Sequence, residues 1–247
     1  MKQLDFEHGT VTGNILGAAV PMLVAQILNL LYNIVDRIYI ARIPKVGTAA
    51  LGAVGLCFPL IVIITAFSNL YGSGGAPLFS IHRGKKETQT ANDIMNTSFS
   101  MLCLTGVILM VVGMLLIRPI LILFGASEML YLIGTLPSMI AVGMNPFINA
   151  QGYSLTGMLS VAIGAAANLV LDPLFIFVLG FGVRGAAIAT VISQFLSAAF
   201  VLHFLSGKAE LKVRFLRRTE LAGSVSYAKE IVSLGTAGFI MQLTNSL

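Results

Sequence analysis

The chain has 247 residues, of which 57% are hydrophobic and 10% charged, with a formal net charge of +5 and a mean hydropathy of +0.92. Soluble domains carry about 25% charged residues, so this chain has too few charges to cover the surface of a soluble fold. The composition excludes a soluble globular domain, a disordered chain and a nucleic-acid-binding protein, and it is typical of a polytopic membrane protein.

Stretches without formal charge define the predicted membrane helices, since a helix needs about 20 apolar residues to cross the hydrocarbon core. The longest stretch, from Met129 to Leu171, is long enough for two helices and is divided by turn residues at 151–157. A seventh helix begins near Ile231. The sequence therefore predicts an all-α polytopic membrane helix bundle, with six complete transmembrane helices followed by the start of the seventh. The six complete helices are Ile15–Ile40, Gly47–Pro77, Ile94–Ile117, Met129–Gln151, Leu155–Leu179 and Gly185–Ser206.

Basic residues are distributed unequally over the two sides of this bundle. The N-terminal tail and the even-numbered loops carry Lys2, Arg83, Lys85, Lys86, Lys208, Lys212, Arg214, Arg217, Arg218 and Lys229, and the other side carries Arg37, Arg42, Lys45, Arg118 and Arg184. The positive-inside rule then predicts a multi-pass protein of the plasma or inner membrane with a cytoplasmic N-terminus. The basic loops face anionic lipid in this interpretation, and nucleic acid is not an expected partner.

Two acidic residues lie inside the predicted membrane helices, whereas the other eight lie in loops or at the N-terminus. Asp36 lies about 6 Å and Asp172 about 10 Å before the outer ends of their helices, at about 1.5 Å per residue. An acid in a membrane span costs a few kcal/mol and usually faces a cavity or a partner. We therefore expect the two carboxyl groups to lie at similar depth and to be functional.

Two further polar residues belong to the same predicted site. Asn168 precedes Asp172 by one helical turn and lies on the same face. Thr190 lies about 9 Å from the outer end of its helix. Carboxylate, amide and hydroxyl oxygens suit a hard cation, and paired acids also suit proton exchange.

Both acids also have a purely structural interpretation. Asp36 could pair with its neighbour Arg37, and Asp172 could cap the helix break made by Pro173. Adjacent residues on a helix point about 100° apart, which weighs against the first alternative.

A proline and a polar stripe mark the first predicted helix. Pro21 removes a helical hydrogen bond and favours a kink, which is either a hinge or a static bend. Gln26, Asn29 and Asn33 follow at spacings of three and four residues and lead to Asp36. Such a stripe faces a cavity or another helix rather than lipid, and we favour a cavity.

Signatures of catalysis are absent from the sequence. There is no HExxH, no GxSxG and no Ser/His/Asp set, so no enzyme is predicted and no cofactor is expected. Cys57 and Cys103 have no nearby cysteine or histidine partner and are interpreted as small packed residues.

Several separated motifs resemble those of the multidrug and toxic compound extrusion (MATE) transporters, in the same order as in that family. They are PMLVAQILNLLYNIVDRIYIAR at Pro21–Arg42, AALGAVGLCFPL, the glycine-rich end of the second helix, NAQG at Asn149–Gly152, NLVLDPLFIF at Asn168–Phe177 and GVRGAAIATVISQ at Gly182–Gln194. The resemblance covers most of the chain.

The resemblance implies a secondary active antiporter that exports organic cations or other amphipathic drugs in exchange for Na⁺ or H⁺. It implies a bundle of twelve helices in two lobes, with Pro21 as the hinge. The implied cation- or proton-coupling residues, which would also be the ligands of any bound Na⁺, are Asp36, Asn168, Asp172 and Thr190, the set already selected from depth and helical face. The substrate cavity is expected to include Gln26, Asn29, Asn33, Asn145 and Asn149.

The chain departs from the family in two respects. Residues 1–230 are predicted to form an N-terminal six-helix lobe with a cytoplasmic linker, and residues 231–247 a truncated first helix of the second lobe. Near the C-terminus, Gln242 and Asn245 repeat Gln26 and Asn29 at one constant offset. Since such repeats place substrate between lobes, the missing C-terminal lobe is an expected partner, with small-molecule substrates and the lipid bilayer. In addition, the stretch 127–151 is shorter than is usual in the family.

Two other functions stay open at this point. A lipid-linked oligosaccharide flippase of the same superfamily would line its cavity with basic residues, whereas the spans here contain only Arg37, near a helix end. A non-transporting truncated fragment is the other alternative.

Overall fold

The computed structural model of the chain describes residues 3–6, 9–44, 47–124, 132–216 and 220–244. These residues form α-helices and no β-strand, which confirms the predicted all-α class. Two single π-helical turns, η1 (Leu174–Val178) and η2 (Phe204–Lys208), extend the helices that precede them. The α-helices are α1 (Val11–Ala41), α2 (Gly47–Gly84), α3 (Thr88–Phe124), α5 (Thr135–Ala150), α6 (Ser154–Pro173), α7 (Val183–His203) and α8 (Leu221–Thr244).

The predicted count of six complete transmembrane helices and the start of a seventh is not matched. Among the described residues there are seven α-helices, of which five are long and apolar enough to cross a membrane: α1, α2, α3, α6 with η1, and α7 with η2. The 16 residues of α5 span only about 24 Å. Its predicted start at Met129 lies outside the described residues.

Several helices extend beyond the limits predicted from charge. The helix α3 continues past Asp93 and Arg118, and α8 begins at Leu221, well before the predicted start at Ile231. A charged side chain ends the hydrocarbon-embedded part of a helix but does not end the helix itself, because the backbone hydrogen bonds continue into the headgroup region. The predicted division of the chain after residue 230 therefore falls within α8.

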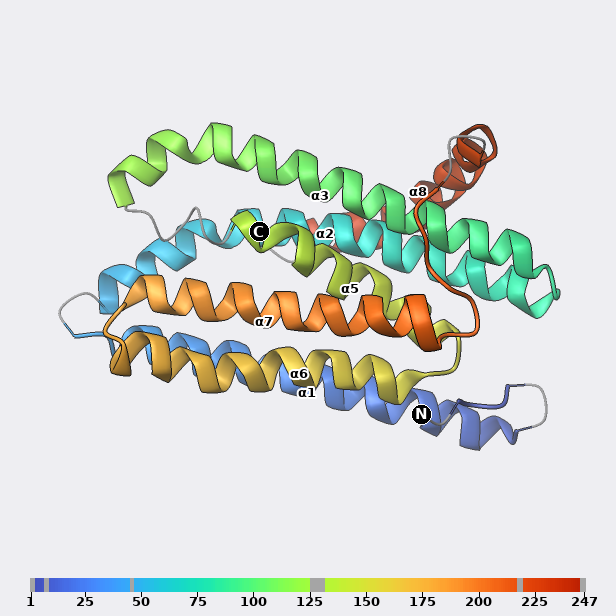
Figure 1. Ribbon diagram of the computed structural model, residues 1–247, viewed down its shortest axis with the longest axis horizontal. Coiled ribbons are helices and arrows are strands. Elements are labelled where there is room, and N and C mark those ends of the chain that lie inside the picture. The colour runs from blue at the N-terminus through green and yellow to red at the C-terminus, as the bar shows by residue number, and fades with distance from the viewer. Residues whose placement is uncertain (1–2, 7–8, 45–46, 125–131, 217–219, 245–247) are drawn as a thin grey trace.

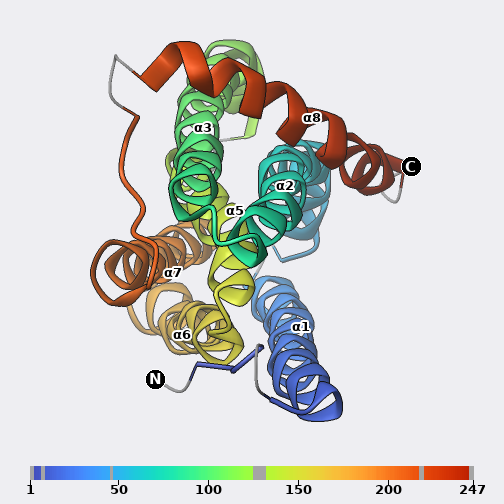
Figure 2. The ribbon, with the colours of Figure 1, turned by 90° about the vertical axis from the view of Figure 1, so that its right-hand side faces the viewer.

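Apart from α8, the helices lie roughly side by side around the central helix α5 (Figures 1 and 2). On one side, α1 packs along α6, and α6 packs along α7. On the other, α2 packs against α3, while α8 lies across α2 and also contacts α3. Because α5 contacts α2, α3, α6 and α7, it joins the two groups of helices.

The packed core lies where α2, α3, α5 and α7 meet. Phe79 and Phe147 are fully buried there, with ring centroids 5.6 Å apart in an edge-to-face arrangement that adds about 0.5–1.5 kcal/mol to their burial. By contrast, most of α1 is exposed in this chain and apolar, and Ile40 is its one buried residue. Side chains such as Val11 and Leu23, 75% and 62% exposed, are suited to lipid.

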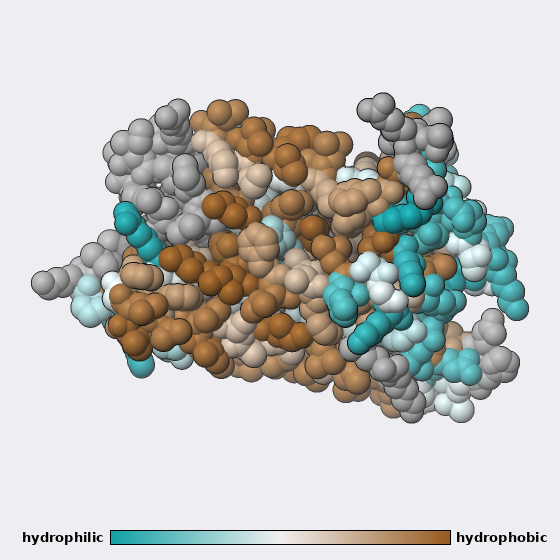
Figure 3. All heavy atoms as spheres, in the orientation of Figure 1, coloured by the Kyte–Doolittle hydropathy of each residue, from teal (hydrophilic) through white to brown (hydrophobic). Residues whose placement is uncertain are grey.

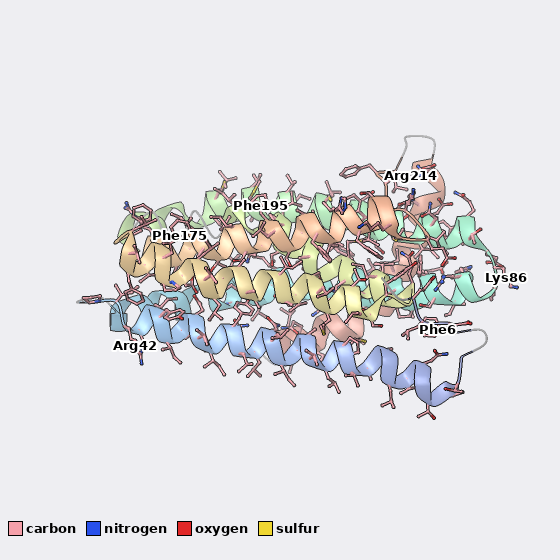
Figure 4. The ribbon with its side chains drawn as sticks, turned by 60° about the horizontal axis from the view of Figure 1, so that its bottom comes forward. Phe6, Arg42, Lys86, Phe175, Phe195 and Arg214 are labelled. Atoms are coloured by element: carbon pink, nitrogen blue, oxygen red, sulfur yellow. The ribbon has the colours of Figure 1, made fainter. Side chains whose placement is uncertain are left out.

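The two ends of the bundle differ in polarity. Figure 3 shows an apolar band over the length of the helices and hydrophilic residues gathered at the end that carries the α2–α3 turn. Figure 4 places Phe6 and Lys86 at this end, which we call the N-terminal end, and Arg42 at the opposite end. An apolar band between polar ends is the surface expected of a protein that spans a bilayer.

Candidate functional site: a polar cavity beside a pair of acids

A cavity of about 420 Å³ lies between α1, α2, α5, α6 and α7. Its wall is rich in uncharged hydrogen-bonding side chains. These polar lining residues are Gln26, Asn29, Tyr32, Asn69, Ser73, Ser138, Asn145, Asn149, Ser160, Asn168, Thr190, Ser193, Gln194 and Ser197. Among the described residues that line the cavity, none carries a charge.

Four of the five predicted cavity residues line this space: Gln26, Asn29, Asn145 and Asn149. Asn33 does not. Its side chain is exposed, and its amide nitrogen donates to the backbone oxygen of Asn29 at 2.7 Å. Tyr32 is thus the last polar residue of α1 that lines the cavity, because the helical twist points the side chain of Asn33 away from it.

The two acids predicted from their depth are neighbours. Asp36 is near the end of α1 and Asp172 near the end of α6, and their carboxyl groups interact directly. Asp172 is fully buried. The oxygens Asp36 Oδ1 and Asp172 Oδ2 are both buried without a hydrogen-bond donor among the described residues. Since a carboxylate only accepts hydrogen bonds, the contact becomes a hydrogen bond only when one acid carries a proton.

Asn168 and Thr190 connect the acid pair with the cavity. Asn168 Nδ2 lies 3.4 Å from Asp172 Oδ1 and 3.4 Å from Thr190 Oγ1, and both residues line the cavity. The hydroxyl of Thr190 donates to the carbonyl oxygen of Ala186 at 3.0 Å. The structure therefore brings together all four residues predicted for the coupling site, and the acids lie about one helical turn beyond the cavity wall.

Sequence reasoning missed Tyr32, Asn69, Ser73 and Gln194, which also line the cavity. Tyr32 lies one turn before Asp36 on the same face of α1, so its spacing could have indicated it. It is close enough to both acids to interact with them electrostatically. Asn69 and Gln194 carried no such signal, because only the packing of α2 and α7 turns them towards the cavity.

The structure bears on both structural interpretations of the acids. Arg37 interacts electrostatically with Asp36, but among the described ion pairs there is none between these two residues, and the side chain of Arg37 is exposed. Asp172 does not end its helix, since η1 continues through residue 178. The hinge prediction stays untested: α1 runs as one helix through Pro21.

A hydrogen-bonded chain fixes the shape of the cavity wall between α5 and α6. Asn145 Nδ2 donates to the carbonyl oxygen of Gly157 at 2.9 Å and to Ser160 Oγ at 2.7 Å. Asn149 Nδ2 in turn donates to Asn145 Oδ1 at 3.1 Å. A Cβ at Gly157 would overlap Asn149 Oδ1, so a larger residue at this position would displace the amide of Asn149.

We expect Asn145→Leu to lower the free energy of unfolding by about 1–3 kcal/mol, because the amide of Asn149 loses its acceptor and the hydroxyl oxygen of Ser160 loses a donor, while the carbonyl of Gly157 keeps only its bond from Ser160 Oγ. Thermal unfolding in detergent measures this. Asn33→Leu is the matched control, since Asn33 is exposed and outside the wall, and it should stay within about 0.5 kcal/mol of the wild type. Equal effects of the two changes would contradict a structural role for Asn145.

The residues near the acid pair offer mainly oxygen atoms as potential ligands. Among the described residues, no group of three or more His, Cys, Asp and Glu side chains could hold a metal ion. Asp36 and Asp172 supply carboxylate oxygens, and Thr190 a hydroxyl oxygen. Asn168 turns its nitrogen towards Asp172, so its oxygen could join a cation only after the amide rotates.

Comparisons with known proteins agree with this geometry. The sequence model of the MatE family matches residues 21–174. The multidrug export protein MepA of Staphylococcus haemolyticus is 25% identical over 249 residues, covering 96% of this chain and 54% of the relative. MepA of Staphylococcus saprophyticus is 22% identical with the same coverage. The chain spans about half the length of the curated relatives it matches.

Solved structures share the fold. An outward-facing multidrug resistance MATE transporter of the MOP superfamily has a TM-score of 0.83 at 26% identity, covering 95% of this chain and 53% of that one. A MOP superfamily transporter from Pyrococcus furiosus, described as having a binding pocket of reverse polarity, has a TM-score of 0.82 at 26% identity over the same shares. The family match covers more than half of the chain, from Pro21 within α1 to the end of α6, and the chain belongs to the MATE family.

Proposed function

We propose that this chain forms the N-terminal lobe of a two-lobed, twelve-helix exporter. It would move small amphipathic or cationic molecules across a membrane in exchange for Na⁺ or H⁺. The observation that carries the proposal is the acid pair, half-buried Asp36 and fully buried Asp172, one helical turn from a polar cavity large enough for a small molecule. Membrane acids placed in this way are typical of ion-coupled transport rather than of a structural role.

In the proposed cycle, a cation or proton neutralises Asp36 and Asp172 in the outward-open state. The negative charge next to Asn168 and Thr190 is then lost, and the cavity holds a cationic substrate less strongly. Bending of α1 near Pro21 would displace the substrate. Asn168 contacts Asp172 and also lines the cavity. An ion bound at the acids therefore changes the affinity of the cavity for substrate, and this coupling leads to exchange.

The composition of the cavity favours export of drugs over the flippase alternative. A flippase for a lipid-linked oligosaccharide would need basic side chains for the pyrophosphate. In the described lining there is no Lys or Arg. Amide and hydroxyl groups suit ligands of varied shape with a few hydrogen-bonding groups.

We also propose that the N-terminal end faces the cytoplasm. Lys85, Lys86, Lys208 and Lys212 are exposed at this end or in the segments joined to it. The positive-inside rule assigns such loops to the cytoplasm. The acid pair then lies towards the outer side, where an inward ion gradient delivers the coupling ion.

The test is efflux of ethidium from liposomes that contain the full-length protein. We expect release to start when either a Na⁺ gradient or a pH gradient is imposed, and to stop when that gradient is collapsed by an ionophore. The gradient that drives release identifies the coupling ion. Release that is indifferent to both gradients would contradict antiport.

A further inference from the structure

The turn between α5 and α6, residues 150–152, makes contacts that the cavity does not explain. Each of its three carbonyl oxygens accepts a hydrogen bond from a different group. Ala150 O accepts from Arg83 Nη1 at 3.0 Å, Gln151 O from Gln3 Nε2 at 3.1 Å, and Gly152 O from the backbone nitrogen of Leu4 at 2.9 Å. Gly152 has a φ of +86°, a conformation that favours glycine, so the turn depends on this residue.

Glu210 binds the same groups from the other side. Its Oε2 lies 2.6 Å from Arg83 Nη2 and 3.1 Å from Gln3 Nε2. The Gln151 side chain, fully buried, accepts from the backbone nitrogen of Leu211 at 2.9 Å and donates to its carbonyl oxygen at 3.3 Å. The N-terminal segment, the end of α2 and the segment after η2 are therefore all held at one turn, at the end where Figure 4 places Phe6.

The anchored N-terminal segment lies against the weakest turn of α1. A Cβ built on Gly17 would lie only 2.6 Å from Leu4 Cδ2, so the Leu4 side chain covers Gly17. Pro21 has no N–H, and it follows Gly17 by four residues. The helical hydrogen bond to the Gly17 carbonyl is therefore missing, and the proline ring crowds that carbonyl. Leu4 thus packs on the place where α1 bends most easily.

We propose that the turn at residues 150–152 is the anchor of a latch that holds α1 straight. The latch consists of Gln3, Leu4, Arg83, Gln151 and Glu210. Bending of α1 at Pro21 requires Leu4 to leave Gly17, and the hydrogen bonds at the turn oppose this. None of the five residues lines the cavity, so they are positioning residues that act through α1.

The existence of the latch does not depend on the proposed transport function, but its predicted effect on transport rates does. The change from straight to bent α1 would set the turnover rate, whereas substrate binding in the cavity would be unaffected. Loosening the latch should therefore change kcat and leave KM alone.

The experiment uses Gln3→Leu and Glu210→Gln in the full-length protein. Both residues are exposed, so both variants should fold. Amide hydrogen exchange is followed in the peptide that covers the start of α1. We expect it to be about fivefold faster in each variant, the effect of one ordinary hydrogen bond on an opening equilibrium. Ethidium efflux should show a kcat changed by a similar factor, with KM within about twofold.

Gln89→Leu is the matched control, because Gln89 is an exposed glutamine at the same end and its amide donates to Asp93, outside the latch. It should leave both measurements at wild-type values. Unchanged exchange in both latch variants would overturn the latch, and faster exchange together with unchanged kcat would overturn its control of the turnover rate. A wild-type protein that exports no ethidium would refute the transport function, whereas the exchange measurement would still decide whether the latch exists.

Discussion

Asp36→Asn and Asp172→Asn should each lower ion-driven efflux by about 5- to 150-fold, the range of a coupling free energy of about 1–3 kcal/mol between two sites. Each change preserves the size of the side chain but removes the group that binds the proton or cation. Because the two carboxyl groups interact directly, the double variant should be little worse than either single variant. The measurement is ethidium release from liposomes under the gradient that drives the wild type.

The control for this prediction is Glu87→Gln, which removes one negative charge from an exposed residue in the α2–α3 turn. It should transport like the wild type. Two further results would be informative: full efflux in both aspartate variants would show that the acids are structural, and additive losses would show that they act independently.

Gly235→Ala should separate α8 from α2. A Cβ at Gly235 would overlap the carbonyl oxygen of Leu70, and a Cβ at Gly74 would overlap that of Ile231. Neither oxygen can move without disturbing its helix, so we expect a loss of about 1–3 kcal/mol or more. Contacts between small residues of this kind drive helix association in membranes, where apolar burial contributes little.

Unfolding of the purified protein in detergent measures this loss, and Gly238→Ala provides the control one turn further along α8. No atom lies within 4 Å of a Cβ at Gly238. Alanine favours helix over glycine by about 1 kcal/mol, so Gly238→Ala should be neutral or stabilising. If both variants behave alike, helix propensity rather than the α2–α8 contact governs stability at these positions.

The sequence predicted those site residues whose side chains cost free energy when they are placed inside a membrane span. Asp36 and Asp172 stand out because a buried acid is expensive, and Asn168 follows from helical spacing. Asn33 was placed in the cavity by the same spacing argument, yet its side chain lies outside it. A stripe at spacings of three and four drifts around a helix, and sequence periodicity does not indicate where the cavity ends.

The limits of the helices were likewise predicted well for some helices and poorly for others. Charge-free stretches located the apolar parts of α1, α6 and α7 to within a few residues. They placed the start of α8 too late, because the charged residues Lys229 and Glu230 lie within the helix, where both are exposed. Hydropathy reports which residues tolerate hydrocarbon, whereas helix length is decided by backbone hydrogen bonds.

The sequence by itself determined the membrane class and the acid pair, through local composition and helical periodicity, and it indicated the family through the resemblance of several motifs in a shared order. Only the tertiary structure decided which side chains of α2 and α7 face the cavity. It also revealed the turn that joins the N-terminal segment to α2 and to Leu211. These contacts connect residues up to about 200 positions apart, such as Gln3 and Glu210. Contacts over such separations depend on how the helices pack, and no single helix encodes that packing.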